Sequence, residues 1–142
     1  MSRSEDSLFE LEAQIAEDNR KIRLRFLDAF ETLSKAELIA MAGSDAGAAS
    51  EVERWIGERQ VFSVPVEGED RYPTFQFLDG APRPVIGQAL AILPAERTPW
   101  PNALWFVSSN SWIGGPAPIT LLDSNPAGVL EAAGHESDEI SG

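Results

Sequence analysis

The sequence contains no cysteine and only one histidine, His135, among its 142 residues. Without cysteine the chain forms no disulfides and carries no thiolate chemistry, which fits a reducing cytoplasm. A single histidine in a polar C-terminal tail cannot build a histidine metal cluster and does not support a Ser-His-Asp or Cys-His site. We therefore expect no enzyme activity, no cofactor and no metal.

Long hydrophobic runs are also missing. No apolar stretch approaches the ~20 residues that a transmembrane helix needs, and the acidic, polar start M-S-R-S-E-D is unlike a secretory signal. We therefore expect a soluble cytoplasmic protein that does not interact with a membrane. The 43% of residues that are hydrophobic suffice for a modest core.

Basic residues are scarce. Lys and Arg number 11 against 23 Asp and Glu, which gives a formal net charge of −12 that is spread along the chain. Nonspecific nucleic-acid binding depends on Lys and Arg neutralising phosphates, so the chain as a whole is repelled by DNA.

The tryptophans are concentrated in the stretch from Trp100 to Leu130, which holds three of the four and has Asp123 as its only charged residue. Such a stretch forms a core or a partner surface. Of the tryptophans, Trp55 and Trp105 are predicted to be core residues. Trp100 and Trp112 are compatible with either location.

Glycine and proline divide this stretch into pieces too short for one long helix. We expect a helix over 103–108, a tight glycine turn and a short helix near 119–122. A last helix is expected to begin at Asn125 and Pro126, because Asn caps an orphan N–H and Pro has none to satisfy.

The same stretch carries the motifs S-S-N-S-W-I-G-G and P-I-T-L-L-D-S-N-P-A-G-V-L-E-A-A. They resemble the toxin-binding domain of the Xre/MbcA/ParS type of bacterial antitoxin. Ser109 departs from the family, which usually has proline before the asparagine. The matching positions are Asn110, Trp112, Gly114, Pro118, Leu121, Leu122, Pro126, Val129 and Leu130.

The resemblance implies a partner, a toxin of the RES type, which is an NAD-degrading enzyme whose active-site entrance the antitoxin's C-terminal domain blocks. The candidate partner-binding residues are Asn110, Ser111, Trp112, Gly114, Thr120, Asp123 and Glu131. Alternatively, Trp112, Gly114, Pro118, Leu121 and Leu122 mainly hold the small domain together. On that packing interpretation Trp112→Ala unfolds the domain, and exposed contacts come from Ser111, Thr120, Asp123 and the tail.

Residues 4–33 contain no glycine or proline and are predicted to form one long helix. Its apolar residues recur at spacings of three, four and seven and form one stripe, with an acidic start followed by a basic cluster. The helix either packs on its own domain or pairs antiparallel in a homodimer. Asp18 and Arg25, near the seam, weaken a long coiled coil.

Two capping-box patterns follow, one at Ser34 to Glu37 and one at Ser50 to Glu53, each opening a short helix. Strand-like runs over 61–66 and 71–77 flank a turn at 67–70. The segment W-I-G-E-R-Q-V-F-S-V-P-V-E-G-E-D-R-Y-P-T-F-Q-F resembles the recognition helix and wing of MerR-like winged helix-turn-helix proteins.

A recognition helix meets DNA through its N-terminal end. Here that end is acidic, and carboxylates in the groove would be repelled by phosphates. The candidate DNA-binding residues are Ser50, Arg54, Arg59 and Arg71. The module either binds an operator as a dimer or survives as a packing scaffold.

We therefore predict a mainly α (α+β) fold. Its parts are an N-terminal helix for possible dimerisation (1–33), a degenerate winged helix-turn-helix (34–78), a toxin-binding-like helical domain (79–133) and a mobile acidic tail (134–142). Within the third part, a proline-rich loop over 79–84 precedes a helix over 85–93. The leading functional hypothesis is an antitoxin-like binding protein with possible autoregulatory DNA binding. The alternative is a dimeric transcription regulator or an orphan adaptor without a toxin.

Overall fold

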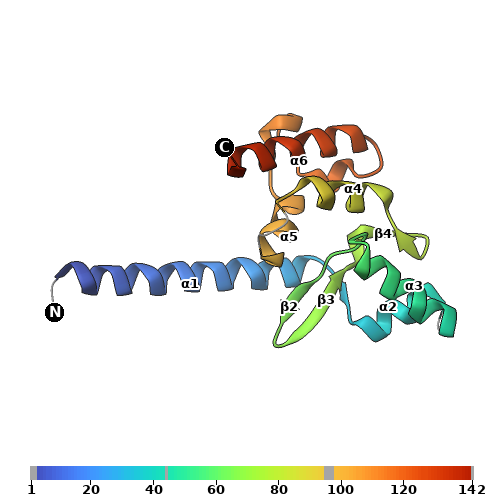
Figure 1. Ribbon diagram of the computed structural model, residues 1–142. Coiled ribbons are helices and arrows are strands. Elements are labelled where there is room, and N and C mark those ends of the chain that lie inside the picture. The colour runs from blue at the N-terminus through green and yellow to red at the C-terminus, as the bar shows by residue number, and fades with distance from the viewer. Residues whose placement is uncertain (1–2, 44, 95–97, 142) are drawn as a thin grey trace. The chain divides into compact units, whose positions relative to one another are not determined.

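The structure is a computed structural model that describes residues 3–43, 45–94 and 98–141. It is mainly helical with small antiparallel sheets, which agrees with the predicted fold class (Figure 1). The chain divides into two compact units, residues 1–31 and 32–142.

The first unit is built on helix α1 (Arg3–Ala29), whose 27 residues include no glycine or proline. The helix was expected to continue to Leu33, and that boundary is wrong. The reason is that Thr32–Leu33 form strand β1, which pairs antiparallel with strand β3 (Glu69–Pro73). Pairing in the sheet satisfies the backbone groups that the helix would otherwise use.

Helix α2 (Lys35–Ala42) begins with the predicted capping box. The Glu37 N–H donates to the Ser34 hydroxyl (3.1 Å), and the Ser34 N–H donates to the Glu37 carboxylate (2.9 Å). This hydrogen bond from the Ser34 backbone lowers the pKa of Glu37. The helix ends as predicted at Gly43, whose φ of 143° suits glycine.

Helix α3 (Ala46–Gly57) starts earlier than predicted. Asp45 is its N-cap and accepts a hydrogen bond of 2.6 Å from the Ala48 N–H, so Ser50 lies inside the helix. The second capping box is therefore wrong, and Glu53 forms an ion pair with Lys35 on α2 instead. Ser44, in the turn between the two helices, lies outside the described residues.

These two serines give a matched test of capping. Ser34→Ala is expected to lower the free energy of unfolding by about 1 kcal/mol, because it leaves an N-terminal N–H of α2 without its acceptor. Ser50→Ala, inside α3 and exposed, is expected to change it by less than about 0.5 kcal/mol. Urea denaturation of both variants measures the difference. Equal effects would contradict the assigned helix starts.

The three-stranded sheet has the order β1-β3-β2, with β2 at Val64–Val66. Strands β2 and β3 form a hairpin around Glu67 and Gly68, which have φ of 52° and 82°, as a tight hairpin turn requires. Residues 69 and 70, predicted as turn, belong to β3.

The second predicted strand, 71–77, is interrupted by the 3-10 helix η1 (Thr74–Gln76). After it, β4 (Phe77–Leu78) pairs with β5 (Ala81–Pro82). The predicted proline-rich loop at 79–84 is thus the turn and second strand of a small hairpin, followed by the first residue of the next helix.

The C-terminal part consists of α4 (Pro84–Ile92), α5 (Pro99–Val107), the 3-10 helices η2 (Ser111–Ile113) and η3 (Pro118–Leu121), and α6 (Pro126–Ser141). Helix α5 begins four residues before the predicted start, with Pro99 in its first turn. Helices α4 and α6 pack side by side (Figure 1).

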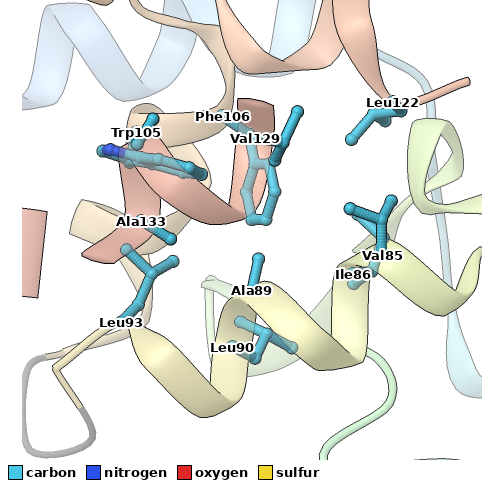
Figure 2. Close-up of a cluster of buried hydrophobic side chains, with 11 residues drawn as sticks. Val85, Ile86, Ala89, Leu90, Leu93, Trp105, Phe106, Leu122, Val129 and Ala133 are labelled. Carbon is cyan, nitrogen blue, oxygen red and sulfur yellow. The ribbon is translucent and has the colours of Figure 1, made fainter. Parts of the chain in front are cut away.

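These helices enclose a hydrophobic core centred on Phe106, which is fully buried (Figure 2). Phe62 and Phe75 pack against it, with ring centroids 5.4 and 6.0 Å from that of Phe106. Trp105 lies in the same core and is buried, as predicted.

A second core joins α2, α3 and the sheet. Trp55 is buried in it, as predicted, with its ring centroid 6.2 Å from that of Phe77. Trp100, whose location the sequence left open, is buried as well.

Helix α6 starts as predicted, because the Asn125 side chain accepts a hydrogen bond of 3.1 Å from the Gly128 N–H. A mobile tail was predicted from residue 134, and that prediction is wrong for 134–141. These residues continue α6, whose inner face contributes Val129, Ala132 and Ala133 to the core. His135 is therefore a helical residue.

Candidate partner-binding surface

The loop that carries Trp112 is closed by hydrogen bonds from Asn110. The Asn110 side chain accepts from the Trp112 N–H (3.0 Å), and the Gly115 N–H donates to the Asn110 carbonyl (2.9 Å). Gly114 and Gly115 have φ of 85° and 109°, values that residues with a Cβ atom rarely adopt. Asn110 and Gly114 therefore shape this loop, whatever else they contact.

Trp112 lies at the surface, with 51% of its area exposed. Its ring stacks on the imidazole of His135 from α6, with centroids 3.6 Å apart and planes inclined by 9°. Of the two locations that the sequence left open for Trp112, the structure shows the surface.

The structure also brings Glu131 to this face. Its carboxylate lies 4.0 Å from His135 Nε2, one helical turn away, and forms an ion pair when the imidazole is protonated. Trp112, His135 and Glu131 make up what we call the indole face. Sequence reasoning missed His135, although its position four residues after Glu131 would place both on one side of a helix.

The other candidate partner residues have different surroundings. Ser111 and Thr120 are exposed, and the Thr120 hydroxyl donates to the Ala117 carbonyl (2.7 Å). Asp123 is exposed but forms an ion pair with Arg83, whose guanidinium also donates to the Phe75 carbonyl (3.1 Å). Asp123 thus helps to fix the start of α4.

Of the five residues given a packing role, Pro118 and Leu122 are buried, in agreement with that role, and Leu121 is partly buried against the same core. Gly114 and Trp112 are exposed. About half of the Trp112 surface is covered, and its ring stacks on a residue of α6.

The candidate DNA-binding arginines are mostly engaged by carboxylates. Arg54 pairs with Glu51 and with Glu58, the latter at 3.3 Å. The hydrogen bond from Arg54 lowers the pKa of Glu51, and the same bond raises the pKa of Arg54. A phosphate would have to displace these carboxylates.

Arg71 is held even more firmly. Its guanidinium donates to the Thr32 carbonyl (3.0 Å) and hydroxyl (3.1 Å) and pairs with Glu69 (3.2 Å). It therefore ties β1 to β3. Ser50 and Arg59 are exposed, and Arg59 has a φ of 54° just after α3.

Within 3–43, 45–94 and 98–141, no group of three or more His, Cys, Asp or Glu side chains is placed to hold a metal ion. In this part of the chain, no helix combines the length and apolarity needed to cross a membrane.

Comparison of the chain with models of protein families, with curated proteins and with solved structures finds no significant match.

Proposed function

We propose that the chain is an antitoxin-like protein that binds and neutralises a toxin of the RES type through its C-terminal helices. The observation that carries this proposal is the half-exposed indole of Trp112, stacked on His135. Trp112 lies within the residues that resemble the toxin-binding domain of Xre/MbcA/ParS antitoxins. That resemblance implies that the partner degrades NAD and that the antitoxin covers its active-site entrance.

A tryptophan at this place suits recognition of a protein. Truncation of interface tryptophans commonly costs more than about 2 kcal/mol of binding free energy, because they fill desolvated pockets. The indole is held on one side by His135 and at its backbone by Asn110. A side chain that is already ordered loses little conformational entropy on binding.

The charge around the indole indicates the partner's chemistry. Glu131 is largely exposed beside it, and the formal charge of the chain is −12. Complementary charge speeds association and sets orientation. We expect a toxin whose entrance is an apolar pocket with a basic rim.

We further propose that α2, α3 and the β2–β3 hairpin form a degenerate winged helix-turn-helix that serves as a scaffold. Arg71 is occupied by Thr32 and Glu69, and Arg54 by Glu51 and Glu58. Autoregulatory DNA binding would require these pairs to open. Of the candidate DNA-binding arginines, this leaves Arg59, which is exposed. A single arginine contact to phosphate is not enough for tight DNA binding.

The test is co-expression with a RES-type toxin, followed by measurement of growth, cellular NAD and the Kd of the purified pair. Trp112→Ala is expected to weaken binding at least about 30-fold, the equivalent of about 2 kcal/mol. Its loss of folding stability should stay within about 2 kcal/mol, because half of the ring already faces water. Circular dichroism and melting temperature measure this separately.

Leu78→Ala is the matched control, because Leu78 and Trp112 are both 51% exposed. It is expected to leave binding within about threefold of wild type, in the range of near-neutral contacts. If the chain does not bind or suppress the toxin, the proposal is wrong. Operator binding that weakens steeply with salt and is lost in Arg54→Ala would instead favour a transcription regulator.

A further inference from the structure

Helix α1 carries a row of large apolar side chains in water. Leu8, Leu11, Ile15 and Ile22 follow one another at spacings of three, four and seven, and they are 57%, 56%, 50% and 42% exposed. Residues at these spacings share one face of an α-helix. We call this row the α1 stripe. Exposed apolar side chains gathered on one face mark an interaction surface, unlike single scattered apolar residues.

The stripe ends at a residue that is already covered. Phe26, the next position on the same face, is buried, and its ring lies 5.0 Å from that of Phe30. The free part of the stripe therefore runs from Leu8 to Ile22, with Ile15 at its centre.

The charges of α1 are divided along its length. Residues 3–14 contain four acidic side chains and one basic, whereas residues 15–25 contain four basic and two acidic. A second copy running parallel would place acid beside acid and base beside base. An antiparallel copy places each acidic half beside a basic half, which is favourable.

From the stripe and this charge division, we propose that two copies of the chain associate through an antiparallel pair of α1 helices centred on Ile15. In this register Ile15 lies against Ile15 of the second copy, and Leu8 lies against its Ile22. Burial of the stripe supplies the driving force, at about 25 cal/mol for each Å² of apolar area removed from water.

Asp18 and Asn19 interrupt the stripe between Ile15 and Ile22 and weaken the seam. Asp18 accepts a hydrogen bond of 2.9 Å from the Gln14 amide on its own helix. Its carboxylate therefore keeps a partner at the edge of the pair. It also shortens the apolar seam, so the dimer should dissociate on dilution.

The first experiment measures the mass of the full chain by light scattering over a range of concentrations. Wild type is expected to approach twice 15.4 kDa as concentration rises. Ile15→Asp should remain monomeric, because it places two carboxylates across the two-fold axis. Leu24→Asp is the matched control, since Leu24 is also 50% exposed but lies off the stripe, and it should dimerise like wild type.

The second experiment determines whether the two α1 helices run antiparallel or parallel. It introduces single cysteines, because the chain has none of its own. Leu8→Cys and Ile22→Cys variants of different tagged mass are mixed and mildly oxidised. The antiparallel register predicts cross-links between the two variants in preference to cross-links of Leu8→Cys with itself.

Three results would overturn the proposal: a wild type that stays monomeric at every concentration, an Ile15→Asp variant that still dimerises, or preferential cross-linking of Leu8→Cys with itself. Circular dichroism confirms that each variant remains helical. Toxin binding is a separate readout that depends on Trp112, so the two proposals fail independently.

Discussion

Gln76→Leu is expected to lower the free energy of unfolding by about 3 kcal/mol, because one buried and two partly buried backbone groups lose their partners at about 1–3 kcal/mol each. Gln76 is completely buried in η1. Its amide oxygen accepts from the Phe62 N–H (2.8 Å), and its amide nitrogen donates to the carbonyls of Phe62 and Pro73 (both 2.9 Å). Leucine has a similar size but can replace none of these bonds.

The glutamine thus joins the loop before β2 to the end of β3. A control is available in Gln88→Leu, an exposed position on α4, which is expected to change stability by less than about 0.5 kcal/mol. Chemical denaturation of both variants gives the comparison. A Gln76→Leu protein as stable as wild type would mean that water or another donor replaces the amide.

Phe106→Ala is expected to cost about 3–5 kcal/mol, the usual loss when a buried phenylalanine is truncated in a core that cannot close around the cavity. The ring is fully buried and is surrounded by Phe62, Phe75 and Trp105, with centroids 5.0 to 6.0 Å away. Collapse is hindered because these rings come from separate segments.

Here Trp112→Ala serves as the control. It removes a larger aromatic side chain from the same part of the chain, but from a half-exposed position. Thermal unfolding should therefore separate the two variants clearly, with Phe106→Ala melting far lower. Similar melting temperatures would show that burial does not determine how much stability an aromatic side chain contributes in this part of the chain.

Features set by local chemistry could be predicted from the sequence. The capping box at Ser34, the stop at Gly43 and the cap at Asn125 all depend on residues within one turn of the helix end. The burial of Trp55 and Trp105 was also predicted correctly. Each of these is decided by neighbours along the chain or by a clear apolar pattern.

Errors arose where two local signals competed or where distant residues decided. Asp45 and Ser50 are both good N-caps, and only the fold shows that Asp45 is used. Thr32 and Leu33 suit a helix until β3 offers backbone partners. The acidic residues from 134 onward were predicted to form a mobile tail, but they extend helix α6, whose earlier turns contribute Val129 and Ala133 to the core.

Distant residues also determine which tryptophan is exposed at the candidate site. Composition placed tryptophans in one stretch but could not tell which of them faces water. That outcome depends on tertiary contacts such as the stack on a histidine more than twenty residues later.

Because the tryptophans are unequally buried, intrinsic tryptophan fluorescence can report on the surface that carries Trp112. Trp55, Trp100 and Trp105 are 3%, 5% and 8% exposed, whereas Trp112 is 51% exposed. An uncharged collisional quencher such as acrylamide should therefore extinguish the emission of one fluorophore preferentially. Shielding of that emission by an added protein would report occupancy of the indole face in real time, without any label.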